Sequence, residues 1–156
     1  MSSVFKAPHD VYVKSNEFSV FLGGSIEMDK AEKWQDALTA NLLENFDNIV
    51  VFNPRRDNWN ASLENSIKNP VFKEQVAWEV DQLEKSDYIL LYFQPGTYSP
   101  ISLLELGMFA DKSKVVVCCP DGFWRKGNVE FVCEKYNIKM IDSYLEFTDF
   151  LKNKFK

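Results

Sequence analysis

The sequence predicts a doubly wound α/β fold, in which helices cover both faces of a parallel sheet. Short apolar runs alternate along the chain with longer segments whose apolar residues recur every three to four positions, and this alternation is typical of repeated strand-helix units. The apolar runs contain few polar residues, as expected for strands that are buried on both faces. Five repeats predict a five-stranded parallel sheet in the flavodoxin-like order 2-1-3-4-5.

The predicted elements alternate from residue 18 to the end of the chain. The expected strands are residues 18–22, 49–52, 87–93, 115–119 and 138–141. The expected helices are residues 29–46, 72–85, 99–112, 128–136 and 144–155. Asp29 and Ser99 are expected to cap the first and third helices, because a side-chain oxygen at that position can accept hydrogen bonds from the first helical turn.

The predicted topology also locates a ligand site. In doubly wound sheets, ligands bind beyond the carboxyl ends of the strands, at the point where the strand order reverses. Here that point lies between the first and third predicted strands. The prediction selects three loops, which are residues 23–29, 53–69 and 94–99.

Composition limits the class of protein. We expect one domain over residues 1–156, with residues 1–15 as a loose N-terminal extension. A formal net charge of −5 and a pI near 5.0 argue against a nucleic-acid partner, because nucleic-acid-binding domains usually carry a basic surface. No stretch approaches the roughly 18 apolar residues of a membrane span. We therefore expect no membrane partner. Cys118 and Cys119 lie in an apolar run, as buried cysteines do, and such free cysteines suit a reducing compartment, so we expect a cytoplasmic protein.

Few residue types are available for chemistry. The chain has one histidine, His9, and no cluster of Cys and His residues, so neither a zinc site nor a histidine-based triad can be assembled. The turn Gly23-Gly-Ser25 matches neither the dinucleotide fingerprint nor the P-loop. We therefore expect no metal and no cofactor, and we expect carboxylates, hydroxyls or amides to carry any reaction.

Glu105 is the most unusual carboxylate, because it lies in the otherwise apolar stretch 103–108 near the start of a helix. At the ligand-binding edge it would be partly desolvated and close to a helix N-terminus, and could act as a nucleophile. A solvated or salt-bridged helix-face glutamate fits the same pattern. For Glu79 and Asp81, on the preceding helix, the residues alone favour a solvated face.

Aromatic residues are common near the three selected loops. Stacking on an aromatic ring stabilises a bound base by about 1–3 kcal/mol, so rings such as Phe21 and Trp59 are candidates for holding a nucleobase. Most of the aromatic side chains are expected to belong to the core.

Three segments together resemble the nucleoside 2-deoxyribosyltransferases, and these are residues 21–26, 87–90 and 99–107. The resemblance spans nearly the whole chain. It implies that Glu105, in the motif Glu105-Leu-Gly107, is the nucleophile. It also implies that Glu79 hydrogen-bonds the base, with Asp81 as the alternative, and that Ser99 contacts the sugar where typical transferases carry Asp.

The resemblance also bears on substrate and assembly. The related monophosphate N-glycosidases read phosphate with a Gly-Ser-Ile-Arg turn, whereas this chain has Gly24-Ser25-Ile-Glu27, and an anion in place of the cation should reject a phosphate. In this family an Asn from a neighbouring subunit completes the site, and Asn128 lies at the expected position. The resemblance therefore implies a homo-oligomer with shared sites.

The function implied by the resemblance is transfer of 2-deoxyribose between nucleobases, with a deoxynucleoside and a free nucleobase as substrates. Glu105 would form a covalent sugar-enzyme intermediate, and the configuration would be retained. Two alternatives stay open, which are a nucleoside or nucleotide N-glycosidase that gives the sugar to water and a non-catalytic nucleoside or nucleotide sensor. The preferred base stays open as well.

Overall fold

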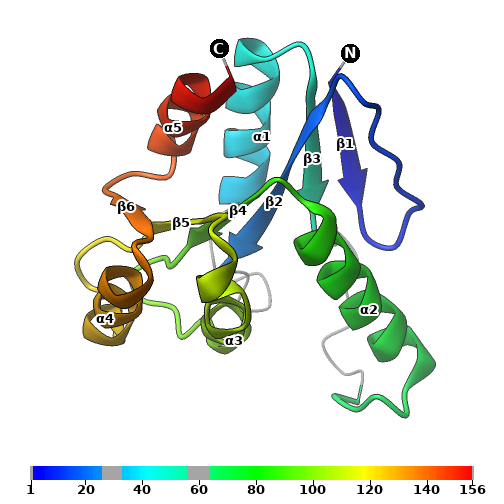
Figure 1. Ribbon diagram of the computed structural model, residues 1–156. Coiled ribbons are helices and arrows are strands. Elements are labelled where there is room, and N and C mark those ends of the chain that lie inside the picture. The colour runs from blue at the N-terminus through cyan, green and yellow to red at the C-terminus, as the bar shows by residue number, and fades with distance from the viewer. Residues whose placement is uncertain (1, 26–32, 56–63, 156) are drawn as a thin grey trace.

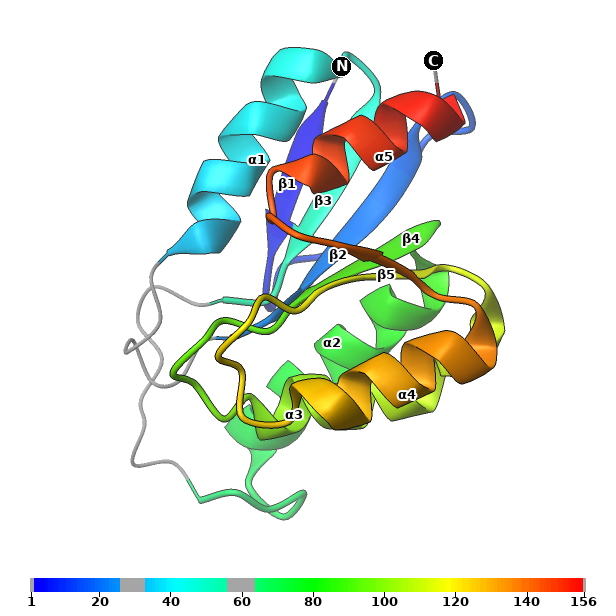
Figure 2. The same ribbon diagram turned by 90° about the vertical axis from the view of Figure 1, so that its left-hand side faces the viewer.

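The computed structural model describes residues 2–25, 33–55 and 64–155. Within these ranges the protein forms a parallel sheet between two layers of helices (Figures 1 and 2). The strands are β1 (Ser3–Lys6), β2 (Phe18–Gly24), β3 (Ile49–Asn53), β4 (Tyr88–Tyr92), β5 (Val115–Cys118) and β6 (Lys139–Ile141). The helices are α1 (Trp34–Asn45), α2 (Pro70–Lys85), α3 (Pro100–Phe109), α4 (Lys126–Tyr136) and α5 (Glu146–Phe155), and a 3-10 turn, η2 (Ala110–Lys112), follows α3.

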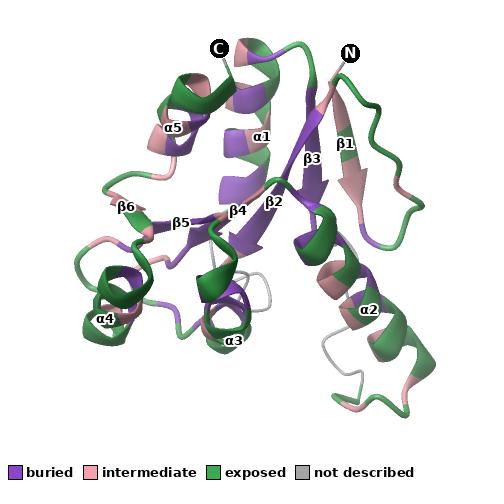
Figure 3. Ribbon diagram, viewed as in Figure 1, coloured by how far each residue is buried: buried purple, intermediate pink, exposed green. Residues whose placement is uncertain are grey.

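The sheet order is β1-β3-β2-β4-β5-β6, and every pairing is parallel. Without β1, this is the flavodoxin-like order 2-1-3-4-5 that the sequence predicts, so the fold class is confirmed. The strand count is corrected from five to six. The apolar strands are buried because helices cover both of their faces, as Figure 3 shows.

The additional strand comes from the N-terminal segment that we expected to be loose. Ser3–Lys6 pairs with β3, with Val4 opposite Val51. The connection that follows β1 is held against α2, because the Trp78 indole donates a hydrogen bond to the His9 carbonyl at 2.8 Å. The sequence does not predict this strand, because its four residues are exposed or only partly buried and show no clear alternation of apolar and polar positions.

The core has two halves, one on each face of the sheet. On one face, α1 and α5 contribute Trp34, Leu38 and Phe147, all fully buried. On the other face, α2, α3 and α4 pack side chains such as Leu83 and Phe109 against the sheet. Figure 2 shows these three helices on one side and α1 and α5 on the other. This arrangement places α2 and α3, with Glu79 and Glu105, on the same face.

The two ends of α2 show how the sequence fixes the bounds of a helix. Asn69 caps α2, since its Oδ1 accepts hydrogen bonds from the backbone N–H groups of Val71 and Phe72, and Pro70 suits the first turn. The Lys114 ammonium closes the other end by donating to the carbonyls of Leu83, Glu84 and Ser86. The expected cap of α1, Asp29, lies outside the described residues.

In the part of the chain that the structure describes, no helix combines the length and apolar character needed to cross a bilayer.

Candidate active site

The candidate site lies at the carboxyl ends of β2 and β4, where the strand order reverses. Gly24 and Tyr92 form the last pair of these two strands. Gly24 has φ of +143°, and a Cβ there would lie 2.3 Å from the Tyr92 carbonyl oxygen. Only glycine therefore fits this position, and it lets the chain turn closely over β4.

Glu105 reaches this edge from the buried face of α3. Only 8% of the residue is exposed, and its Oε1 lies 3.5 Å from the position of a Cβ built on Gly23. Among the described residues, no side chain or backbone group forms a hydrogen bond or ion pair with this carboxyl. Burial, and secondly the nearby charge of Glu79, raise the pKa of Glu105 to about 8.

Glu79 approaches the same region from α2. Gln75, one helical turn earlier, donates from its Nε2 to Glu79 Oε1 at 2.9 Å. Burial raises the pKa of Glu79, and the hydrogen bond from Gln75 acts in the opposite direction. Asp81, by contrast, is exposed on α2. The structure therefore brings Glu79, and not Asp81, into electrostatic contact with Glu105.

Three buried hydroxyl groups lie close together in the loops that follow β2 and β4. Ser25 Oγ lies 2.9 Å from Thr97 Oγ1 and 2.6 Å from Ser99 Oγ, and the last two oxygens are 2.9 Å apart. Thr97 also donates to the Gln94 carbonyl at 2.8 Å, and the Gln94 N–H donates to Ser25 Oγ at 2.9 Å. The loops after β2 and β4 are thereby joined through side chains. The sequence analysis selected both loops but missed Thr97.

Ser99 corrects one expectation. The residue was expected to cap α3, but its side chain forms no capping hydrogen bond, because its hydroxyl belongs to the cluster with Ser25 and Thr97. Its backbone is in the left-handed region, with φ of 48° and ψ of 52°, which is costly for a residue with a Cβ. Strain of this kind is concentrated at functional sites.

The backbone around Ser25 is fixed as firmly as its side chain. The Ser25 N–H donates to the Tyr92 carbonyl at 3.0 Å, and the Trp34 indole donates to the Ser25 carbonyl at 3.0 Å. Ser25 is fully buried as a result. At the opposite, amino-terminal edge of the sheet, the Ser19 N–H donates to Asp87 Oδ2 at 2.7 Å, which joins β2 to the start of β4.

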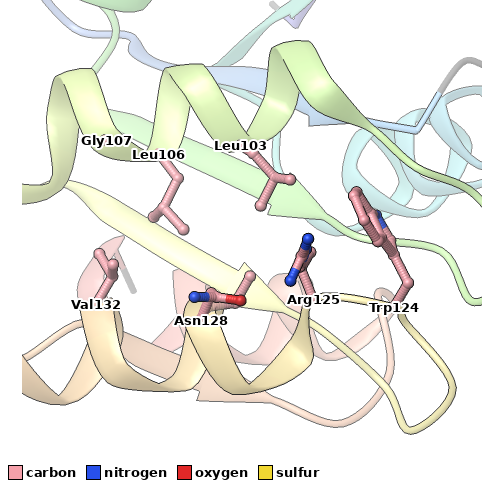
Figure 4. A pocket seen from close by; sticks show the side chains of 8 residues that line it. Leu103, Leu106, Gly107, Trp124, Arg125, Asn128 and Val132 are labelled. Carbon is pink, nitrogen blue, oxygen red and sulfur yellow. The ribbon is translucent and has the colours of Figure 1, made fainter.

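The remaining expected site residues are placed differently. Phe21 is fully buried in the core, and its contact with a nucleobase stays a prediction. Trp59 lies outside the described residues. Asn128 is exposed on α4 and lines a groove between α3 and α4 with Leu103, Trp124 and other side chains (Figure 4). Glu105 is not among the residues that line this groove.

The described residues contain no group of three or more His, Cys, Asp or Glu side chains that could hold a metal ion. Within the described residues, the available groups are the buried Glu105 carboxyl, the half-buried Glu79 carboxyl, an amide and three hydroxyls. Of two carboxyls whose pKa values are both raised, one can hold a proton while the other presents a charged oxygen to a ligand. The fold and site thus define a flavodoxin-like α/β protein whose candidate chemistry belongs to carboxylates.

Comparisons with known proteins narrow this class. A family model described as "Nucleoside 2-deoxyribosyltransferase like" matches residues 17–123. The chain therefore belongs to the nucleoside 2-deoxyribosyltransferase-like family. The matched range contains Gly24, Glu79, Ser99 and Glu105 and ends before Asn128.

The structural comparison agrees on the fold. A solved structure described as a conserved protein from Enterococcus faecalis V583 matches with a TM-score of 0.61 and 11% sequence identity. The match covers 88% of this chain and 99% of that chain. At this identity the likeness concerns the fold alone. No curated protein matches the chain.

Proposed function

We propose that the protein is a nucleoside 2-deoxyribosyltransferase with Glu105 as its nucleophile. The observation that carries this proposal is the Glu105 carboxyl, which is buried at the carboxyl end of β2 and has no hydrogen-bond partner among the described residues. A largely desolvated carboxyl that no described neighbour neutralises is unfavourable in its charged form in the free protein. Such a group is explained if its partner is a ligand, and membership of the family supports a nucleoside in that role.

The first half-reaction forms a sugar-enzyme ester. A Glu105 oxygen attacks the anomeric carbon of the deoxynucleoside, and the bond from that carbon to the base nitrogen breaks. The electron pair of the broken bond stays on the base nitrogen, which takes a proton from Glu79. Protonation matters because a leaving base must not build up a full negative charge.

The second half-reaction reverses these roles. A nitrogen of the incoming base attacks the anomeric carbon, and the ester bond to Glu105 breaks, which regenerates the carboxylate. The proton of the incoming base returns to Glu79. Two inversions at one carbon give overall retention of configuration.

The hydroxyl cluster supports a neutral sugar as the ligand. Ser25, Thr97 and Ser99 bring three hydroxyls together at the carboxyl ends of β2 and β4, and a hydroxyl can both donate to and accept from the hydroxyls of a sugar. A phosphate bound here would lie near the Glu79 and Glu105 carboxyls, which disfavours a further anion. This favours a deoxynucleoside over its monophosphate. Glu27, which led to the same expectation, lies outside the described residues.

We also propose a homo-oligomer with shared sites. Large apolar side chains are exposed on and beside α3 and α4, and these are Tyr98, Ile101, Leu104, Met108, Trp124 and Phe131. Apolar surface of this extent is typical of protein interfaces. Asn128 lies in the groove between these helices and would reach the sugar bound to a neighbouring subunit. The three buried free cysteines fit the reducing cytoplasm in which we propose that the protein works.

Incubation with deoxyadenosine and free cytosine tests the proposal against its alternatives. Transfer gives deoxycytidine and adenine, and it should be lost in Glu105→Gln. Hydrolysis would give deoxyribose and adenine without deoxycytidine. Binding by calorimetry without either product would identify a sensor and contradict both enzymatic readings.

A further inference from the structure

Two indole groups anchor the hydroxyl cluster, one on each of the two chain segments that supply its oxygens. The Trp34 indole donates to the Ser25 carbonyl at 3.0 Å. The Trp124 indole donates to the Tyr98 carbonyl at 2.9 Å, and Tyr98 stands between the two residues that supply the other hydroxyls. Each segment of the cluster is therefore held by one indole N–H group.

Trp34 supports the Ser25 turn from the face of the sheet opposite Glu105. Its side chain is fully buried in the core half that α1 and α5 cover. The ring fills the space beside Gly24, where its Cζ2 atom lies 2.9 Å from the position of a Cβ. It also packs edge-to-face against Tyr92, with ring centroids 5.2 Å apart. The indole thus fixes the backbone of the residue whose hydroxyl contacts both of the others.

Trp124 supports the second segment from the loop that precedes α4 (Figure 4). Its ring packs edge-to-face against Tyr98, with centroids 5.2 Å apart, and the guanidinium carbon of Arg125 lies 4.4 Å from the centroid of the Trp124 ring. The peptide that Trp124 binds leads directly into Ser99, whose backbone is left-handed with φ of 48°. A strained conformation of this kind persists only where its surroundings hold it, and the indole bond is one such restraint.

We propose that Trp34 and Trp124 are positioning residues, whose indole N–H groups hold the three hydroxyls of the cluster at the spacing at which they bind the sugar. This inference rests on the proposed function for the identity of the ligand. Among the described residues, neither indole forms a hydrogen bond with Glu105. The two tryptophans therefore act on binding of the sugar and not on attack at the anomeric carbon.

Trp78 provides a matched control. Its indole also donates to a backbone carbonyl, that of His9 at 2.8 Å, and the residue is also buried, at 7% exposed. His9 lies in the connection that follows β1, so this bond joins α2 to the N-terminal segment and not to the hydroxyl cluster. Substitution of each of the three tryptophans by Phe keeps an aromatic ring but removes one indole donor.

Two neighbouring amides report separately on the cluster and on the sheet. The Gln94 N–H donates to Ser25 Oγ at 2.9 Å, so its hydrogen exchange depends on the position of the cluster. The N–H of the preceding residue, Phe93, donates to the Cys118 carbonyl at 2.9 Å, so its exchange depends on the sheet. A general loosening of the fold would speed the exchange of both amides alike.

The test is amide hydrogen exchange measured by NMR on the protein free of substrate. In Trp34→Phe and in Trp124→Phe, the Gln94 amide should exchange about 2- to 10-fold faster relative to the Phe93 amide, which corresponds to the loss of one hydrogen bond. Trp78→Phe should leave this ratio at its wild-type value.

Steady-state kinetics give a second measurement. The KM for a deoxynucleoside should rise by a similar factor in Trp34→Phe and in Trp124→Phe, because the hydroxyls contribute to binding of the sugar. The kcat should stay within about twofold of the wild-type value, because neither substitution removes a group that acts only in the transition state.

An unchanged exchange ratio in either Trp34→Phe or Trp124→Phe, or an equal change in Trp78→Phe, would overturn the inference. A changed ratio together with an unchanged KM would overturn it as well, because the cluster would then not contact the substrate. If Trp34→Phe does not fold, Trp124→Phe carries the test alone, since Trp124 is 50% exposed. The exchange measurement needs no nucleoside, so it can fail while deoxyribosyl transfer is observed, and it can succeed where no transfer is found.

Discussion

Glu79 on α2 and Glu105 on α3 come from different helices, yet the charge of Glu79 contributes to raising the pKa of Glu105 to about 8. The relationship depends on the sheet, because α2 and α3 cover the same face of it. An acid whose pKa is raised by burial and by the charge of a second acid is a common arrangement where a proton must be exchanged during a reaction.

Replacing Glu105 with glutamine should change the pH dependence of stability. A carboxyl whose pKa is raised on folding binds protons more tightly in the folded state, so the free energy of unfolding falls as pH rises from about 4.5 to about 8. The isosteric Glu105→Gln removes this dependence and should be more stable than the wild type at pH 8, by an amount on the order of a few kcal/mol. Urea denaturation at pH 5 and pH 8 measures the difference. Equal stability of the two proteins at pH 8 would show that Glu105 is solvated.

Removal of the Thr97 hydroxyl tests the cluster with Ser25 and Ser99. Thr97→Val keeps the shape of the side chain but leaves buried partners unpaired, and should lower the free energy of unfolding by about 1–3 kcal/mol. The KM for a deoxynucleoside should rise, because Ser99 loses its support. Thr39 provides the control, since its buried hydroxyl has no partner and Thr39→Val should be neutral or stabilising. Similar losses from both substitutions would mean that the cluster contributes nothing specific.

Two glycines should respond oppositely to alanine. Gly24→Ala places a Cβ against the Tyr92 carbonyl in a backbone conformation that alanine rarely adopts, and should prevent folding or cost several kcal/mol. At Gly107, in α3, a Cβ would meet nothing within 4 Å, so Gly107→Ala should stabilise the protein by about 0.5–1 kcal/mol through helix propensity. Thermal melts of both variants decide this, and a tolerated Gly24→Ala would contradict the described turn.

The proposed assembly can be tested with two matched leucines. Leu104, on α3, is 60% exposed, and Leu43, on the opposite helical layer in α1, is 38% exposed. A charge at an apolar interface is strongly unfavourable, so Leu104→Asp should convert the oligomer to monomers in sedimentation experiments. Leu43→Asp should leave the assembly unchanged. A wild-type protein that sediments as a monomer would exclude the shared site.

The strand order could be predicted from the sequence, but one of the strands could not. Apolar runs such as Val115–Cys118 and Tyr88–Tyr92 are easily recognised as strands, because strands covered on both faces must be apolar. The edge strand Ser3–Lys6 has no such requirement, since it is exposed or only partly buried. The capping role expected of Ser99 was wrong for a related reason, because its hydroxyl is taken by Ser25 and Thr97, which are distant in sequence.

The choice between Glu79 and Asp81 could have been sharpened from the sequence. Glu79 shares a helix face with Trp78, Gln82 and Leu83, whereas Asp81 falls on the face of Glu74 and Lys85. The first face is the one that packs on the sheet. The bond from Gln75 to Glu79, by contrast, could not be predicted, because its geometry depends on where α2 lies relative to the Pro54 carbonyl.

The most direct test of the account is covalent labelling of Glu105 itself. A 2'-fluoro-2'-deoxynucleoside slows breakdown of a sugar-enzyme ester, because fluorine disfavours the oxocarbenium-like transition state. After incubation and proteolysis, mass spectrometry should find the fluorosugar on the peptide that contains Glu105, and Glu105→Gln should remain unlabelled. A stable label on any other residue, or turnover of deoxynucleosides by Glu105→Gln, would contradict the assignment of Glu105 as the nucleophile.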